Sequence, residues 1–211
     1  MISAAALEYF LSALTTLMVT VDPPGLAPIF LSLTLGMTAP ERRSVALRAT
    51  LIAGLIMLGF AFFGQPVLGA LGIGFPAFRI AGGLLLFWIA FEMIFELRAR
   101  RKTNVARTAI DEDHIRNVAA FPLAIPLMAG PGTITATMLL AGSAQGETIR
   151  LGALVAVIAL VSVSCFAVFL VADRLSKLLG VTGNLVLTRL LGVLLAALAV
   201  QFVIDGIKAV M

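Results

Sequence analysis

Charged residues are scarce in this chain of 211 residues, where Asp, Glu, Lys and Arg together make up only 12% of the sequence. Hydrophobic residues make up 61%, and the mean hydropathy is +1.10. Both values lie far from those of soluble globular domains. The composition therefore excludes a soluble domain and predicts an integral membrane protein.

Cysteine and histidine are nearly absent, because Cys165 and His114 are the single residues of their kinds. One cysteine excludes an intramolecular disulfide and cannot build a zinc site. The sequence also lacks the G-x-S-x-G and H-E-x-x-H motifs of hydrolases and metalloproteases. We therefore expect no enzymatic activity, no cofactor and no metal site. The acidic run at 111–114 is interpreted as a favourable start to a helix.

Six apolar windows are each long enough to cross a bilayer, which takes about 20 residues in a helix. Their continuous apolar character argues against barrel strands, which alternate. No basic segment precedes the first window, so we expect it to be retained rather than cleaved. The sequence predicts an all-α integral membrane fold with six transmembrane helices in a single domain, 1–211. The windows cover residues 5–35, 46–71, 77–96, 118–142, 149–172 and 187–208.

Basic residues are distributed unevenly over the two sides that six spans define. By the positive-inside rule, the side with the excess faces the cytoplasm, so both termini are expected to be extracytoplasmic. The excess side carries Arg42, Arg43, Arg48, Arg98, Arg100, Arg101, Lys102, Arg107, Arg116, Arg174, Lys177 and Arg189, and the other side carries Arg79, Arg150 and Lys208.

The net charge of +4 is thus a topological signal, and we expect no nucleic-acid partner. Residues 98–117 are predicted to form a charged cytoplasmic loop. Its basic cluster is a candidate for binding anionic lipid headgroups of the inner leaflet; the cluster comprises Arg98, Arg100, Arg101 and Lys102. The oligomeric state stays open, because glycine-rich helices pack within one chain or between chains.

Two segments of the chain resemble each other. F-R-I-A-G-G-L-L at 78–85 matches T-R-L-L-G-V-L-L at 188–195, at an offset of 110 residues, and Pro24 and Gly25 match Pro131 and Gly132 at an offset of 107. Each half, 1–97 and 118–211, holds three spans, so the second half would be inverted relative to the first. Such inverted repeats are typical of secondary transporters.

The first and fourth windows contain helix breakers at corresponding places. Proline removes a backbone donor, so helices 1 and 4 are predicted to be broken. Paired breaks are a sequence indication of a transporter's binding site. The breakers are Pro23, Pro24 and Pro28 in the first window and Pro122, Pro126, Gly130, Pro131 and Gly132 in the fourth.

The half-helix after the second break is predicted to receive an anionic group through free N–H groups. The half-helix before the first break would offer carbonyls and an acid to a cation, a proton or an ammonium group. A charged residue in a bilayer is costly and functional by default, so Asp22 is the candidate for binding the coupling ion or proton. The predicted substrate-binding residues are Thr20, Asp22, Gly25, Gly130, Gly132, Thr133, Thr135 and Arg189.

Two alternatives remain open for these residues. In the first, the prolines only kink packed helices and Asp22 is a structural cap. Arg189 either reaches the headgroups or pairs with Asp22 or a substrate carboxylate. Glu92 is expected at the membrane interface.

Four motifs of the chain are specific in combination: D-P-x-G-x-x-P-I-F-L-S-L-T, P-L-A-I-P-L-x-A-G-P-G, F-R-I-A-G-G and L-T-R-L-L-G-x-L-L-A-A-x-A-V-Q-F-V-I-D-G-I. In these motifs the sequence resembles the MarC family of bacterial inner-membrane proteins, also called UPF0056, and the resemblance extends along its whole length. This chain departs from the family pattern at Pro24, where a branched aliphatic is common, and at Leu26, where asparagine is usual. A missing amide removes one possible ligand at the first break.

The resemblance implies a six-span inner-membrane protein that is distantly similar to the LysE superfamily of amino-acid exporters. It also implies transport of small neutral amino acids such as glycine and alanine. Transport of such a solute, coupled to an ion or a proton, is the function we expect. A non-transporting membrane protein, such as a partner subunit or a lipid-organising protein, and a passive channel remain alternatives.

Overall fold

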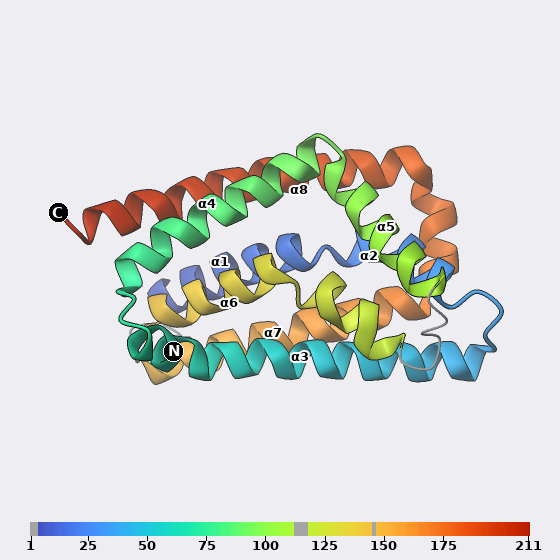
Figure 1. Ribbon diagram of the computed structural model, residues 1–211, viewed down its shortest axis with the longest axis horizontal. Coiled ribbons are helices and arrows are strands. Elements are labelled where there is room, and N and C mark those ends of the chain that lie inside the picture. The colour runs from blue at the N-terminus through green and yellow to red at the C-terminus, as the bar shows by residue number, and fades with distance from the viewer. Residues whose placement is uncertain (1–3, 112–117, 145–146) are drawn as a thin grey trace.

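The computed structural model describes residues 4–111, 118–144 and 147–211, and every regular element in these ranges is a helix (Figure 1). The elements in chain order are α1 (Ala4–Val21), α2 (Pro23–Leu33), α3 (Ala39–Ala70), α4 (Phe75–Ile94), α5 (Leu97–Asp111), η2 (Ala119–Met128), α6 (Pro131–Ser143), α7 (Thr148–Leu170) and α8 (Ala172–Lys208).

The membrane spans agree with the apolar windows of the sequence. Five helical stretches in the described ranges are long and apolar enough to cross a bilayer, and a sixth forms when η2 and α6 are counted as one span. That pair is bent by 59° at the break between its two parts. The all-α membrane fold and the broken first and fourth spans are therefore confirmed, whereas the inverted relation of 1–97 to 118–211 stays a prediction.

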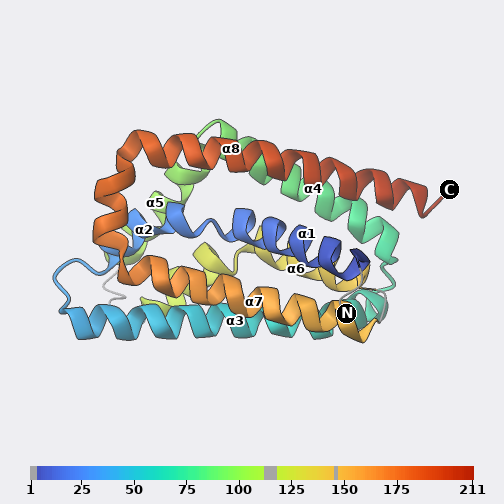
Figure 2. The ribbon, with the colours of Figure 1, turned by 180° about the vertical axis from the view of Figure 1, so that it is seen from behind.

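The two broken spans lie in the middle of the molecule. In Figures 1 and 2, α1 and α6 run side by side between α3 and α7 on one side and α4 and α8 on the other, and the contacts among these helices agree. Glycines allow the close approach of α4 to α8: a Cβ at Gly83 would lie 2.8 Å from the carbonyl oxygen of Ala199. The breaks are thus enclosed by the unbroken helices.

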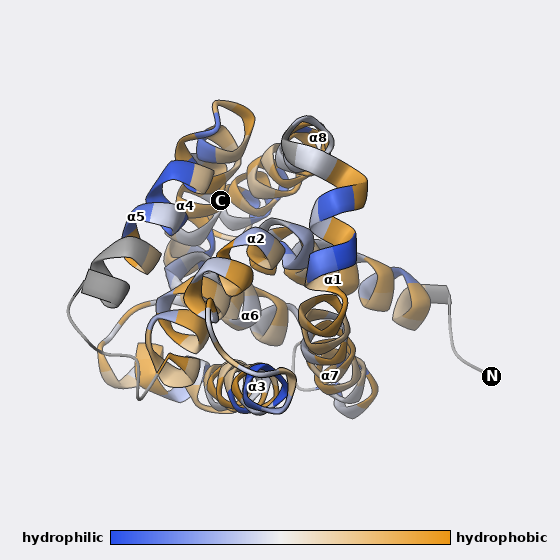
Figure 3. Cartoon of the chain, turned by 90° about the vertical axis from the view of Figure 1, so that its right-hand side faces the viewer, coloured by the Kyte–Doolittle hydropathy of each residue, from blue (hydrophilic) through white to orange (hydrophobic). Residues whose placement is uncertain are grey.

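Apolar side chains cover the outside of the unbroken helices, as expected for surfaces in lipid. Leu51, Phe63 and Val163 are examples of such exposed residues. Hydrophilic residues gather at one end, over α5 and the first turns of α3 and α8 (Figure 3). The break residue Asp22, by contrast, is only 3% exposed.

Two segments depart from the sequence prediction. The region 98–117 was predicted to be a loop, but Leu97–Asp111 forms helix α5, which packs against α2, α4 and η2. The last helix begins at Ala172, well before the predicted window, and is interrupted at Gly180, whose φ is +58°. The acidic run continues through 112–114, which lie outside the described residues.

Candidate functional site

The first break is made by one aspartate and two prolines. Asp22 has left-handed backbone angles, φ 58° and ψ 64°, and caps α2 by accepting a hydrogen bond from Gly25 N–H at 3.1 Å. Pro23 and Pro24 have no N–H, so Gly25 carries the first donor that α2 offers. A Cβ at Gly25 would lie 2.1 Å from Asp22 Oδ2. Glycine is therefore required for the carboxylate to reach this position.

The end of α1 leaves carbonyl groups without helical donors. Pro24 stands where the donor to Thr20 C=O would be, and the N–H of Gly25 bonds to Asp22 instead of Val21 C=O. Buried carbonyls of this kind need other partners. The sequence predicted that this place would receive a cation, a proton or an ammonium group.

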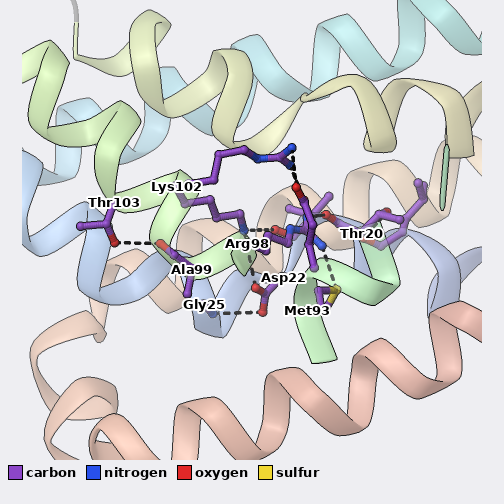
Figure 4. Close-up of polar contacts among 12 residues, drawn as sticks. Thr20, Asp22, Gly25, Met93, Arg98, Ala99, Lys102 and Thr103 are labelled. Carbon is purple, nitrogen blue, oxygen red and sulfur yellow. Dashed lines mark hydrogen bonds and ion pairs between the residues drawn. The ribbon is translucent and has the colours of Figure 1, made fainter. Parts of the chain in front are cut away.

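Helix α5 supplies that cation from within the chain. Arg98 donates a hydrogen bond to the carbonyl of Thr20, and Lys102 Nζ lies 3.4 Å from the carbonyl oxygen of Val21. The same Nζ lies 3.5 Å from Asp22 Oδ2. Figure 4 shows both basic side chains extending from α5 to the break between α1 and α2.

These charged groups are removed from solvent. Arg98 is 7% and Lys102 6% exposed. Helix α5 lies outside the spanning segments, and burial there lowers the pKa of Lys102 from 10.5 to about 8, an effect that Arg98 reinforces and Asp22 opposes. Burial likewise lowers the pKa of Arg98. Both side chains thus carry a desolvation cost that their partners offset in part.

The second break has a different structure. Phe121 and Ile125 have extended backbones, which is favoured for residues that precede proline. Gly130 is the N-cap of α6, and a Cβ there would lie 2.4 Å from the carbonyl oxygen of Pro126. Glycine is therefore needed at this turn as well. Helix α6 begins at Pro131 and aims its first N–H groups back toward the break.

A cavity of about 430 Å³ lies at this second break. One wall is apolar and comes from α4, with Leu85, Trp88 and Ile89. The polar lining comes from the first turn of α6 and from α5. This polar lining comprises Gly130, Gly132, Thr133, Arg98, Arg101 and Lys102.

Arg98 and Lys102 also line a small cavity of about 30 Å³ on the side of Asp22. The two cations therefore stand between the first break and the larger cavity at the second. Arg101 points to the same region and pairs with Glu92, with 3.0 Å between Nη2 and Oε2. Glu92 is 7% exposed, so its side chain is enclosed by protein, and its place at the membrane interface stays a prediction.

The structure places the predicted site residues in three groups. Thr20, Asp22 and Gly25 form the first break, although the Thr20 hydroxyl donates to Thr16 C=O inside α1 at 2.8 Å. Gly130, Gly132 and Thr133 line the cavity. Thr135 and Arg189 lie elsewhere: the methyl group of Thr135 packs against Gly82 of α4, and the exposed Arg189 pairs with Glu96 rather than with Asp22.

The basic cluster of α5 is divided by helical periodicity. Arg98 and Lys102 are four residues apart and share the buried face, while Arg100 and Arg101 are exposed. Arg98 and Lys102 are enclosed by protein, so Arg100 and Arg101 are the members of the cluster whose side chains are open to headgroups. The headgroup contact stays a prediction. The spacing of four residues was the one signal in the sequence for this inward face.

Comparison with known proteins agrees with the resemblance. The model of the family described as "MarC family integral membrane protein" matches residues 7–211. A UPF0056 membrane protein of Methanocaldococcus jannaschii is 34% identical over 203 residues, covering 96% of this chain and 97% of the relative. The UPF0056 membrane protein YhcE of Escherichia coli is 37% identical over 193 residues, covering 90% and 87%. No solved structure matches this chain. The chain belongs to the MarC family of multi-pass integral membrane proteins.

Proposed function

We propose that this MarC-family protein is a secondary transporter of a small polar solute, with its site between the two broken spans. Small neutral amino acids are the first solutes to test, as the family resemblance implies. The inner, or plasma, membrane is the proposed location, with both termini extracytoplasmic because basic residues favour the cytoplasmic side.

One observation carries the proposal. Arg98 and Lys102 touch the first break and also line the cavity at the second break. A solute bound in the cavity would therefore act on the same two side chains that contact the end of α1 and Asp22. A linkage between a binding site and a helix break is what alternating access requires.

Asp22 is the proposed site of ion or proton coupling. Its carboxylate accepts from Gly25 N–H and pairs with Lys102. A proton or Na⁺ on Asp22 would weaken the pairing with Lys102 and change the charge in the cavity. Coupling thus rests on competition between an external cation and the internal cation Lys102 for one carboxylate.

The test is uptake of labelled amino acids into liposomes that contain the purified protein, with and without imposed pH and Na⁺ gradients. Saturable uptake that a gradient drives, and that Asp22→Asn abolishes, is the expected result. Asp173→Asn is the matched control, because Asp173 is exposed and pairs with Arg42 at the surface. Flux that does not saturate would indicate a passive channel, and no flux of any solute from folded protein would favour a non-transporting role.

A further inference from the structure

The pairing of the buried charges at the site is incomplete. Arg98 donates to the carbonyl of Thr20 and contacts the sulfur of Met93 at 2.9 Å. Among the described residues, no carboxylate lies within ion-pair distance of its guanidinium. A buried guanidinium with only neutral partners is costly, and an anion with matching geometry would offset that cost.

The local charges also leave a positive excess. Arg98, Arg101 and Lys102 line the cavity, and the carboxylates that face them are Asp22 and Glu92. Three cations thus meet two carboxylates among the described residues. The neighbouring pair of Glu96 and Arg189 is balanced in itself. The cavity is therefore suited to one negative charge.

Across the cavity, on α6, Thr133 provides a second and independent observation. Thr133 is 3% exposed, lines the cavity, and its hydroxyl has no hydrogen-bond partner within the described ranges 4–111, 118–144 and 147–211. Thr133 Oγ1 is not among the fully buried side-chain oxygens that lack a partner, so this hydroxyl is open to a group in the cavity. Thr133 stands in the first turn of α6, where free N–H groups and the helix dipole favour an anion.

The rest of the cavity favours an apolar group. Leu85, Trp88 and Ile89 form the α4 wall, and Val105 and Leu127 add further apolar surface. A substrate ammonium group would have to compete with Lys102 for Asp22, the carboxylate at the first break. An amino acid would have to displace Lys102, whereas a carboxylate with a short apolar chain would not.

We propose that the cavity binds a small monocarboxylate: the acid group contacts Arg98, the Thr133 hydroxyl and the first N–H groups of α6, and the apolar chain lies against α4. This inference rests on the proposed transport function and, within the class of small polar solutes, replaces neutral amino acids by organic monoanions as the expected substrate. The planar guanidinium of Arg98 matches a carboxylate better than a point charge would.

Trp88 provides the probe, because it is the one tryptophan of the chain and lines the cavity. Purified full-length protein in neutral detergent is titrated with hexanoate, norleucine and hexanamide, which share one carbon chain and differ in charge. Quenching of Trp88 fluorescence by 6-bromohexanoate reports occupancy. Hexanoate is expected to compete at least about tenfold better than norleucine or hexanamide, since charge-assisted hydrogen bonds are the strong ones.

Three variants test the contacts. Thr133→Val keeps the shape but removes the hydroxyl, and is expected to weaken hexanoate binding about tenfold. Arg98→Lys keeps the charge but loses the planar donor pair, with a loss of similar size or larger. Thr135→Val is the control on the same helix, because Thr135 does not line the cavity, and it should bind as the native protein does.

The remaining outcomes separate the two proposals. Hexanoate binding that depends on Thr133, without any uptake into liposomes, would support the carboxylate site and overturn transport. Uptake of alanine or norleucine, with tighter binding than hexanoate, would overturn the monocarboxylate and leave transport standing. Two further results would overturn the carboxylate site. One is equal quenching of Trp88 by 6-bromohexanoate and by 6-bromohexanol. The other is displacement of 6-bromohexanoate by phosphatidylglycerol at a far lower concentration than by hexanoate.

Discussion

Both helix breaks contain proline and glycine, but they differ in how their polar groups are paired. At the first break, Asp22 and the α1 carbonyls are satisfied by Gly25, Arg98 and Lys102 of the same chain. At the second break, the first turn of α6 faces a cavity, and the hydroxyl of Thr133 has no partner within the described residues. The first break is thus closed by internal charges, while the second is left available to a solute.

The difference follows from the position of α5. Its buried face reaches the C-terminal end of α1, where basic groups are favourable. The same face points a net positive charge at the N-terminal end of α6, where basic groups are unfavourable. An internal cation completes the first break, and on our proposal an external anion completes the second.

The largest effect is expected when the internal partner of Asp22 at the first break is removed. Lys102→Met keeps the length of the side chain but removes the N–H donors that lysine offers in either protonation state, so Asp22 and the carbonyl of Val21 stay buried without this partner, which should destabilise the fold by about 3–5 kcal/mol. The thermal unfolding midpoint in detergent measures this. Arg100→Met, on the exposed face of α5, is the control and should change little.

A double variant checks the cause. Asp22→Asn keeps an acceptor for Gly25 N–H and removes the charge, so Asp22→Asn combined with Lys102→Met should recover most of the stability that Lys102→Met loses. If the double variant is as unstable as Lys102→Met alone, the loss comes from packing rather than from the unpaired carboxylate.

Substitution of the turn glycines compares the two breaks directly. Gly25→Ala places a methyl group on the Asp22 carboxylate, and Gly130→Ala places one on the carbonyl oxygen of Pro126. Each should cost about 1–3 kcal/mol, and Gly25→Ala should also disturb the Lys102 pair. Gly59→Ala in α3 is the control, because nothing lies within 4 Å of its added Cβ. Equal midpoints for all three variants would contradict the observed turn geometry.

Carboxylate binding and protein stability should both depend on pH. Lys102, which faces Asp22, Arg98 and Cys165, has its pKa lowered to about 8 by burial. Carboxylate binding should therefore fall as pH rises through about 8, when the cavity loses a positive charge. Stability should change in the opposite direction between about 8 and 10.5, because the unfolded lysine holds its proton there and the folded one does not.

Titration of Trp88 quenching and of the unfolding midpoint over this range separates the two effects. Both trends should be absent in the Lys102→Met protein. Binding that strengthens above pH 8 would mean that the anion does not depend on Lys102.

The smallest effect is expected outside both breaks. Arg189→Gln removes an exposed ion pair with Glu96, and such pairs contribute about 0–1 kcal/mol. Hexanoate binding and the unfolding midpoint should both stay near the native values. A loss of binding comparable to that of Thr133→Val would show that Arg189 belongs to the binding site, as the sequence predicted.

Most of the fold was predictable because its signals are local. Hydropathy marked the spans, and the runs around Pro23 and Pro131 marked the breaks, since proline removes a donor wherever it stands. The predictions for Asp22, Gly25, Gly130, Gly132 and Thr133 rested on those breaks, and the structure places all five residues there or at the cavity.

Contacts between segments that are distant in the chain could not be predicted from the sequence. Arg98 and Lys102 were read as a surface cluster, because a run of basic residues beside a span is usually at the lipid headgroups. The ion pairs of Glu92 with Arg101 and of Arg189 with Glu96 were not predicted, since each joins residues of different segments. The four-residue spacing of Arg98 and Lys102 was the one local signal for α5, and it does not show which helices that face would meet.

The sequence by itself determined that this protein crosses the membrane and that its first and fourth spans are broken, because hydrophobicity and the missing proline donor act within a few residues. Only the tertiary structure decided that one break is closed and the other open. That outcome depends on α5 packing against α2, α4 and η2, which brings Arg98 and Lys102 to carbonyls that lie 78 and 81 residues away in the chain.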